Sequence, residues 1–226
     1  MKQDTIAAMA TPAVSSAIGI LRLSGPRAVE TASACFRPAA GNRLEDHPAH
    51  KLVYGSLLDA QGEVIDQVLC TYSRGPGSYT GEDTAELQCH GSPAVLAMAL
   101  EALFAQGVRQ AGPGEFTKRA FLNGKLDLTQ AEAVVDLIDA ETAAAARNAA
   151  AQLDGGLRRV LEPVQEELLE VTSRFYAVVD YPDEDIQDVR PEEIAAALRS
   201  AAGRLERLLD TCRRGQVLKS GVRTAI

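Results

Sequence analysis

Two stretches of the chain concentrate polar side chains among glycines, and these are the places where chemistry could occur. The first covers residues 74–91 (RGPGSYTGEDTAELQCHG) and the second covers residues 114–127 (GEFTKRAFLNGKLD). Glycine lets the backbone turn tightly and come close to a ligand. We therefore expect the functional residues of this chain to lie in or beside these two stretches.

Glu86 is the carboxylate of the first stretch that a strand would hold most rigidly. Alternation predicts a strand over residues 84–89, with positions 84, 86 and 88 on one face and Ala85, Leu87 and Cys89 on the other. A carboxylate fixed on a strand could accept hydrogen bonds from two N–H groups of a flat heterocycle. The same spacing also fits an ordinary glutamate on a protein surface.

Two cations and one histidine are further candidates. Arg22 is the only charged residue between Asp4 and Arg27, and an arginine in an apolar strand either faces solvent or binds an anion. Lys125 follows a short predicted helix and could likewise meet an anion or be exposed. His90 is the only histidine in either stretch, and its alternatives are a structural hydrogen bond or a role as general base.

Several kinds of site are excluded by what the sequence lacks. There is no GxxxxGK[ST] phosphate-binding loop and no GxSxG nucleophile motif. None of the three histidines has the spacing of a zinc site with a cysteine. The four cysteines show no CxxC pairing, which predicts reduced thiols of a cytosolic protein: Cys35, Cys70, Cys89 and Cys212.

Composition narrows the class of protein. The chain has 226 residues, a formal net charge of −8, 4% aromatic residues and no tryptophan, which disfavours a freestanding nucleic-acid-binding protein. No stretch approaches the ~20 apolar residues of a membrane span. The uncharged segment over residues 5–21 is interrupted by proline and serine, so we expect no signal peptide.

The first part of the chain reads as an α+β domain. Strands are predicted over residues 18–23, 51–58, 63–72 and 84–89, and the second and third of them form a hairpin. One helix is predicted from Pro26 to about Cys35. Another has Ser92 as N-cap, Pro93 as first residue and Gly107 beyond its end. Strands and helices mixed in this order indicate the α+β class.

After residue 118 the sequence reads as helix. A capping box over residues 129–132 begins an alanine-rich helical stretch that extends to about Leu153. Apolar residues then recur every three or four positions over residues 157–178 and 194–208, which predicts two long packed helices. Pro163 marks either a first turn or a kink. An acidic run over residues 180–193 and a basic one over residues 199–223 are solvated faces or a docking surface.

The segment GEFTKRAFLNGKLDLTQAEAVVDLIDAET, from Gly114 to Thr142, resembles the MnmE family of tRNA-modification GTPases, also called TrmE. Three further stretches agree with it: DTIAAMATP with IGILRLSG near the N-terminus, SYTGEDTAELQCHGS in the middle, and DYPDEDI from Asp180 to Ile186. The resemblance is long, specific and covers essentially the whole chain.

The resemblance implies a division into three parts. Residues 1–118 would form a folate-binding and dimerisation domain, similar to the tetrahydrofolate-binding domain of aminomethyltransferases. Residues 119–215 would be the first half of a helical domain, and residues 216–226 the start of a GTP-binding domain. The segment GVRTAI over residues 221–226 looks like the first strand of that domain, so the chain is expected to be a fragment of a longer protein.

The resemblance also implies ligands and partners. The family's folate-contacting positions correspond by motif to Arg22, Glu86 and Lys125, with 5-formyl- or 5,10-methylene-tetrahydrofolate as the cofactor. GTP, potassium and magnesium would act only through the GTP-binding domain. The partners would be a second copy of the chain and the flavoprotein MnmG, and the two proteins would install an aminomethyl or carboxymethylaminomethyl group at carbon 5 of the tRNA wobble uridine in the cytoplasm. No catalytic residue and no metal ligand is expected in this chain.

Two other functions remain open from the sequence. The chain could be a stand-alone folate-dependent enzyme similar to the aminomethyltransferases, acting on a small amine. It could instead be an interaction module, with the helical half as a docking scaffold. Folate binding separates the last possibility from the others.

Overall fold

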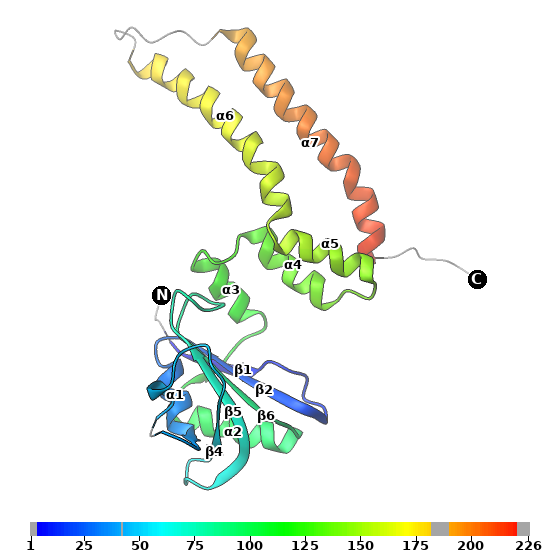
Figure 1. Ribbon diagram of the computed structural model, residues 1–226. Coiled ribbons are helices and arrows are strands. Elements are labelled where there is room, and N and C mark those ends of the chain that lie inside the picture. Colours follow the sequence, from blue (N-terminus) through cyan, green and yellow to red (C-terminus); the bar gives the residue numbers. More distant parts are fainter. Residues whose placement is uncertain (1–3, 42, 182–189, 221–226) are drawn as a thin grey trace, which may run out of the picture. The chain divides into compact units, whose positions relative to one another are not determined.

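The computed structural model describes residues 4–41, 43–181 and 190–220. They divide into two compact units, Met1–Asp127 and Leu128–Ile226, which we call the sheet unit and the helical unit (Figure 1). The expected α+β domain followed by an all-helical segment is confirmed.

Within the described residues, the sheet unit builds one seven-stranded sheet in the order β3-β4-β5-β6-β2-β1-β7. Neighbouring strands are antiparallel except β1 and β7, which are parallel. The strands are β1 (Ile6–Met9), β2 (Ser16–Ser24), β3 (Phe36–Pro38), β4 (Val53–Leu58), β5 (Val64–Ser73), β6 (Thr84–Gly91) and β7 (Arg109–Gln110). The four strands and the hairpin predicted from the sequence are therefore present.

Helices cover one face of this sheet and leave the other open. Helices α1 (Ala28–Cys35) and α2 (Pro93–Ala105) pack on the buried face, and their apolar residues join those of β2, β5 and β6 in one core. A short 3₁₀ helix, η1 (Leu44–Asp46), and helix α3 (Glu115–Leu122) complete the unit. We call the face opposite α1 and α2 the open face.

The register of β2 against β6 decides which residues share the open face. Ala85, Leu87 and Cys89 point into the core, as the alternation predicted, so Glu86 lies on the open face. Arg22 stands directly opposite Glu86 in the pairing of β2 with β6. Directly opposed residues of two antiparallel strands point to the same side of a sheet, so the arginine shares the open face with the glutamate.

The predicted start of the first helix is wrong by two residues. Pro26 lies in a turn, and α1 begins at Ala28. The backbone N–H of Arg27 donates to the Thr5 hydroxyl at 2.9 Å, and that of Ala28 donates to the carbonyl of Gly25 at 3.1 Å. The N-terminal segment of the chain thus fixes this turn, which a local proline signal cannot anticipate.

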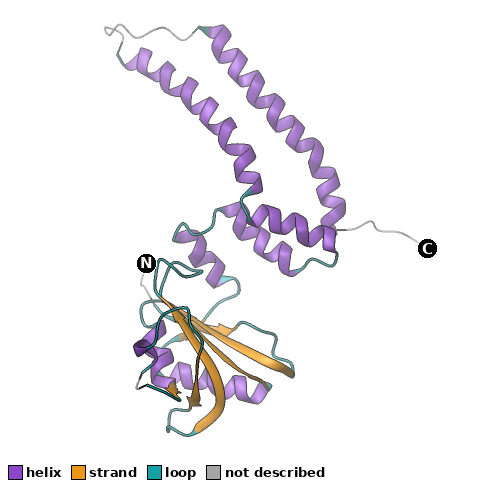
Figure 2. Ribbon diagram, in the orientation of Figure 1, coloured by secondary structure: helices purple, strands orange, loops and turns teal. Residues whose placement is uncertain are grey.

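Among its described residues, the helical unit contains helices joined by loops and no strand (Figure 2). They are α4 (Leu128–Ile138), α5 (Ala143–Leu153), α6 (Gly156–Asp180) and α7 (Pro191–Ser220). Helices α4 and α5 form a hairpin, and α6 and α7 run antiparallel (Figure 1). Among the described residues, no helix combines the length and the apolar character needed to cross a membrane.

Two local predictions for these helices are corrected. Helix α4 begins at Leu128, so Thr129 already lies inside it and is not its N-cap. The alanine-rich stretch is not one helix, because Thr142 starts α5 by accepting a hydrogen bond from the backbone N–H of Ala145 at 3.1 Å. Pro163 lies inside α6 and beyond its first turn. The strand predicted over residues 221–226 and most of the acidic segment after Tyr181 lie outside the described residues.

The cysteines support a prediction about thiol reactivity. Cys35, Cys70 and Cys89 are buried, and burial raises the pKa of Cys35 to about 11 and that of Cys89 to about 12. Cys212 is exposed. Because the thiolate is the reactive form, titration with a coloured disulfide reagent at pH 7.5 should detect one fast thiol per native chain and four after denaturation. Cys212→Ser should abolish the fast phase; a second fast thiol in the native protein would contradict the burial of the other three.

Candidate ligand-binding site

The site is centred on an ion pair on the open face of the sheet. The Arg22 Nε donates to Glu86 Oε1 at 2.7 Å, and the two side chains are 34% and 28% exposed. Across residues 4–41, 43–181 and 190–220, neither Glu86 Oε2 nor the terminal nitrogens of Arg22 make another hydrogen bond. One carboxylate oxygen and the guanidinium NH₂ groups thus remain available to a ligand.

Two aromatic rings accompany the arginine. The guanidinium carbon of Arg22 lies 5.7 Å from the centre of the Tyr79 ring and 5.8 Å from that of Phe116. Such distances are typical of cation–π contacts. Tyr79 comes from the loop between β5 and β6 and Phe116 from α3, and we call these two residues the aromatic pair. Neither Tyr79 nor Phe116 is among the site residues predicted from the sequence, although each lies in one of the two polar stretches.

Lys125 contacts the loop between β5 and β6 but does not contact the ion pair of Arg22 and Glu86 by a hydrogen bond among the described residues. Its Nζ donates to the carbonyl of Pro76 at 3.0 Å. A Cβ on Gly81 would lie 3.2 Å from the Cγ of Lys125, so the aliphatic part of the lysine packs against the same loop. In the described part of the chain, no hydrogen bond joins Lys125 to Arg22 or Glu86. The structure therefore brings two of the three predicted residues into contact and places the third on the loop beside them.

A polar cavity of about 370 Å³ lies next to Glu86. This volume falls within the range of small-molecule pockets, at its lower end. Hydroxyl groups dominate its lining, which consists of His50, Thr71, Tyr72, Ser73, Gly77, Ser78, Tyr79, Thr84, Ala85 and Glu86. His50 is the one non-glycine residue with a positive φ (63°) among those the structure describes, and its Nδ1 lies 3.1 Å from the Ser73 hydroxyl. No local sequence pattern predicts that His50 lies at this cavity.

His90 has a structural partner at the far end of β6. Asp66 accepts a hydrogen bond from the backbone N–H of His90 at 2.8 Å, and its other oxygen lies 2.7 Å from His90 Nδ1. This arrangement favours the structural alternative over the general base.

Arginines and carboxylates form a network beside the aromatic pair. Arg119 contacts Asp4 at 2.7 Å, Glu82 at 2.9 Å and Glu115 at 3.1 Å, and its side chain is only 11% exposed. Arg109 contacts Asp4 and Glu115, each at 2.6 Å. The network joins the N-terminal segment, the loop between β5 and β6, and α3. We call it the arginine network.

The arginine network predicts a loss of stability in acid. The hydrogen bond from Arg109 is the largest influence on Glu115 and lowers its pKa from 4.5 to about 2. A carboxyl group whose pKa is lower in the folded state stabilises the fold above its ordinary pKa, and this contribution disappears as the pH falls toward the lowered value. Urea unfolding should therefore show that wild-type stability falls between pH 4.5 and 2 and that Glu115→Gln lacks part of this fall.

Glu63→Gln provides the matched control for that prediction, since Glu63 is an exposed residue of the same unit with no ion pair among those the structure describes. Its pH dependence should equal that of the wild type. If Glu115→Gln also followed the wild-type curve, Glu115 would not contribute to the loss of stability in this pH range.

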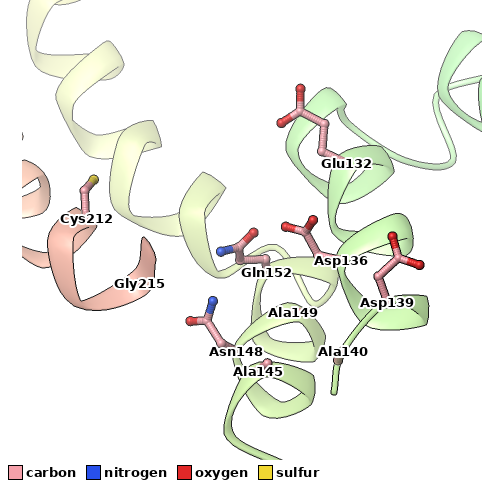
Figure 3. Close-up of a pocket in the computed structure, with 10 residues that line it drawn as sticks. All are labelled: Glu132, Asp136, Asp139, Ala140, Ala145, Asn148, Ala149, Gln152, Cys212 and Gly215. Atoms are coloured by element: carbon pink, nitrogen blue, oxygen red, sulfur yellow. The ribbon is translucent and has the colours of Figure 1, made fainter. Parts of the chain in front are cut away.

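A second cavity lies in the helical unit and has a volume of about 550 Å³ (Figure 3). Carboxylates of α4 and amides of α5 line it together with Cys212: the residues are Glu132, Asp136, Asp139, Ala140, Ala145, Asn148, Ala149, Gln152, Cys212 and Gly215. None of the predicted site residues lies here. Among the described residues, no group of three or more His, Cys, Asp and Glu side chains is arranged so that it could hold a metal ion.

Comparison with known proteins gives matches along the whole chain. The family model described as "GTP-binding protein TrmE N-terminus" matches residues 5–125, and the model "MnmE helical domain" matches residues 128–223. The chain is 44% identical over 226 residues to the tRNA modification GTPase MnmE of Symbiobacterium thermophilum. The aligned region covers 100% of this chain and 50% of that protein. The chain is 41% identical over 227 residues to the protein of the same name from Carboxydothermus hydrogenoformans, and this alignment covers 100% of the chain and 49% of that relative. The chain thus spans about half the length of these curated relatives.

Proposed function

The chain belongs to the MnmE family, of which it represents the N-terminal and helical parts, and we propose on this basis that it binds a reduced folate for tRNA modification. The proposed ligand is 5-formyl- or 5,10-methylene-tetrahydrofolate, which when bound supplies a one-carbon unit. The proposed contacts are Arg22, Glu86 and Lys125.

The donor and acceptor groups of the site fit such a ligand. The edge of a pterin ring presents adjacent N–H donors, which a carboxylate can accept, and Glu86 keeps Oε2 available on the open face. The Nε of Arg22 orients the carboxylate from 2.7 Å. The aromatic pair offers apolar surface to a flat ring. The guanidinium of Arg22 and the ammonium of Lys125 can each pair with a carboxylate of the folate tail, and we do not assign which of them does so.

One observation carries this proposal. Arg22 and Glu86 come from motifs 64 residues apart, yet they form a hydrogen-bonded pair on the open face beside a cavity. A surface glutamate without function would not need a cavity on one side and a half-buried arginine on the other.

The rest of the proposal concerns the whole protein. We propose that residues 1–118 form the folate-binding and dimerisation domain, with Lys125 contributed from just beyond it. Residues 119–215 would be part of a helical domain and residues 216–226 the start of a GTP-binding domain. The GTP-binding domain would hydrolyse GTP with potassium and magnesium. With the flavoprotein MnmG, the protein would modify carbon 5 of the tRNA wobble uridine in the cytoplasm.

Calorimetric titration of the purified chain with 5-formyl-tetrahydrofolate tests the proposal. We expect saturable binding with about one ligand per chain. GTP serves as the control ligand and should give no saturable heat, because the sequence contains no P-loop motif. If a folded chain released no heat with the folate, the folate assignment would fail and the interaction module would become the better hypothesis.

A further inference from the structure

We propose that Arg119 is a positioning residue for the folate site, which sets the aromatic pair against Arg22 through the carboxylates of Glu82 and Glu115. This inference rests on the proposed function, because reduced folate is the ligand whose affinity it should control. Arg119 contacts neither Arg22 nor Glu86 by any hydrogen bond among the described residues, so its effect must pass through other groups.

The first connection runs from Arg119 to the loop that carries Tyr79. The Arg119 Nη1 donates to Glu82 Oε2 at 2.9 Å, and the same oxygen accepts a hydrogen bond from the Ser24 hydroxyl at 2.7 Å. The Ser24 and Thr80 hydroxyls lie 2.7 Å apart, and both residues are fully buried. Ser24 closes β2, the strand of the site arginine, and Thr80 directly follows Tyr79. Arg119 thus ties the loop to that strand.

The second connection runs from Arg119 to α3. The Arg119 Nη2 donates to Glu115 Oε1 at 3.1 Å, one helical turn earlier, and Glu115 directly precedes Phe116. The hydroxyls of Tyr79 and Thr117 lie 3.0 Å apart, which joins the loop to the same turn of α3. One guanidinium therefore holds both elements that carry the aromatic pair.

Charge and burial explain why this contact should matter. The Arg119 side chain is 11% exposed, and those of Glu82 and Glu115 are 22% and 18% exposed. Removing this largely buried cation leaves Glu82 without a positively charged partner among the described residues. Asp4 and Glu115, by contrast, keep Arg109. A half-buried carboxylate that loses its cation costs more than the loss of an exposed ion pair.

The Tyr79 and Thr117 hydroxyls still join the loop to α3 when Arg119 is removed. The hydrogen bond from the Asn123 amide to the Thr80 carbonyl also joins them. The loop should then shift against β2 and α3, and the rings should move from their positions at Arg22.

Arg109 offers a matched control. It pairs with Asp4 and Glu115, two of the three acids of Arg119, at comparable distances. It makes no contact with Glu82 among the described residues, and it is 49% exposed. Arg109→Gln therefore disturbs the same network without releasing the loop.

The experiment compares Arg119→Gln with Arg109→Gln in the whole chain. Calorimetry measures the affinity for 5-formyl-tetrahydrofolate, and ¹⁹F NMR of the chain labelled with 3-fluorotyrosine reports on Tyr79, whose signal is assigned with Tyr79→Phe. Arg119→Gln should weaken binding by about tenfold or more, the scale of one hydrogen bond to a charged group, and should shift the Tyr79 resonance. Arg109→Gln should change the affinity by less than about threefold, as expected for an exposed ion pair, and leave the resonance in place.

If Arg119→Gln does not fold, Glu82→Ala replaces it, because this change removes the same loop contact while Arg119 keeps Asp4 and Glu115. Wild-type affinity with an unshifted Tyr79 signal would overturn the inference. An equal loss of affinity in Arg109→Gln would also overturn it, because a general effect on stability would then suffice. If the wild type binds no folate, the proposed function fails, and so does a role of Arg119 in folate binding. A shift of the Tyr79 resonance in Arg119→Gln would then support only the statement that Arg119 positions the aromatic pair.

Discussion

Replacing Glu86 with glutamine should weaken the binding of 5-formyl-tetrahydrofolate by about 10- to 150-fold, which corresponds to the roughly 1.5–3 kcal/mol of a hydrogen bond to a charged group. Glutamine keeps the shape of the side chain but exchanges one acceptor oxygen for an NH₂ group. That group would face the N–H donors of the ligand, and donors cannot bond to each other. Isothermal titration calorimetry of both proteins under identical conditions measures the difference.

Glu101→Gln is the control for this change, since Glu101 is an exposed residue of α2, the helix that covers the opposite face of the sheet. The same chemical change there should leave the affinity unaltered. If Glu86→Gln bound the folate as tightly as the wild type, the open face would not be the binding site. The cavity beside Glu86 would then need another ligand.

Arg22 and Glu86 should also act as a unit. Because their side chains are 2.7 Å apart, the losses caused by Arg22→Gln and Glu86→Gln should not add in the double variant. Residues in direct contact typically show coupling energies of about 0.5–3 kcal/mol. Additive losses would mean that each residue contacts the ligand independently of the other.

The sequence was sufficient to predict on which face of its strand Glu86 lies, but not that its partner is Arg22. Strict alternation over β6 assigns Glu86 to the face opposite Leu87, because successive side chains of a strand point to opposite sides. The partner strand is β2, which is separated from β6 by three other strands along the chain. Since neither strand encodes the order of the sheet locally, the contact with Arg22 became visible only in the folded chain.

The arginine network is even harder to predict from local sequence patterns. Arg119 and Asp4 are 115 residues apart, and both belong to segments whose charges resemble ordinary surface charges. The same applies to the start of α1, which depends on the hydroxyl of Thr5 and not on Pro26. Helix periodicity, by contrast, predicted α6 and the part of α7 up to Leu208, because apolar spacing is a property of each helix alone; α7 continues to Ser220.

Gly25→Ala should destabilise the sheet unit by more than about 3 kcal/mol, as the sum of backbone strain and overpacking. Gly25 has a φ of +130°, which side chains rarely tolerate. A Cβ there would lie 2.5 Å from the carbonyl oxygen of Asp4 and 2.7 Å from the Cα of Thr5. Both neighbours are backbone atoms, and the arginine network and the turn before α1 hold this segment, so it cannot move aside cheaply. Urea unfolding at neutral pH measures the loss.

Gly62→Ala separates the two causes of that loss. Gly62 also has a positive φ, +85°, but a Cβ there would meet nothing within 4 Å. Gly62→Ala should therefore lower the free energy of unfolding by only roughly 1 kcal/mol, the strain of a non-glycine residue at positive φ. The difference between the two variants measures how firmly the segment around Asp4 is held against β2. Equal losses would show that this segment yields freely, and Asp4 could then not serve as a fixed anchor for Arg119.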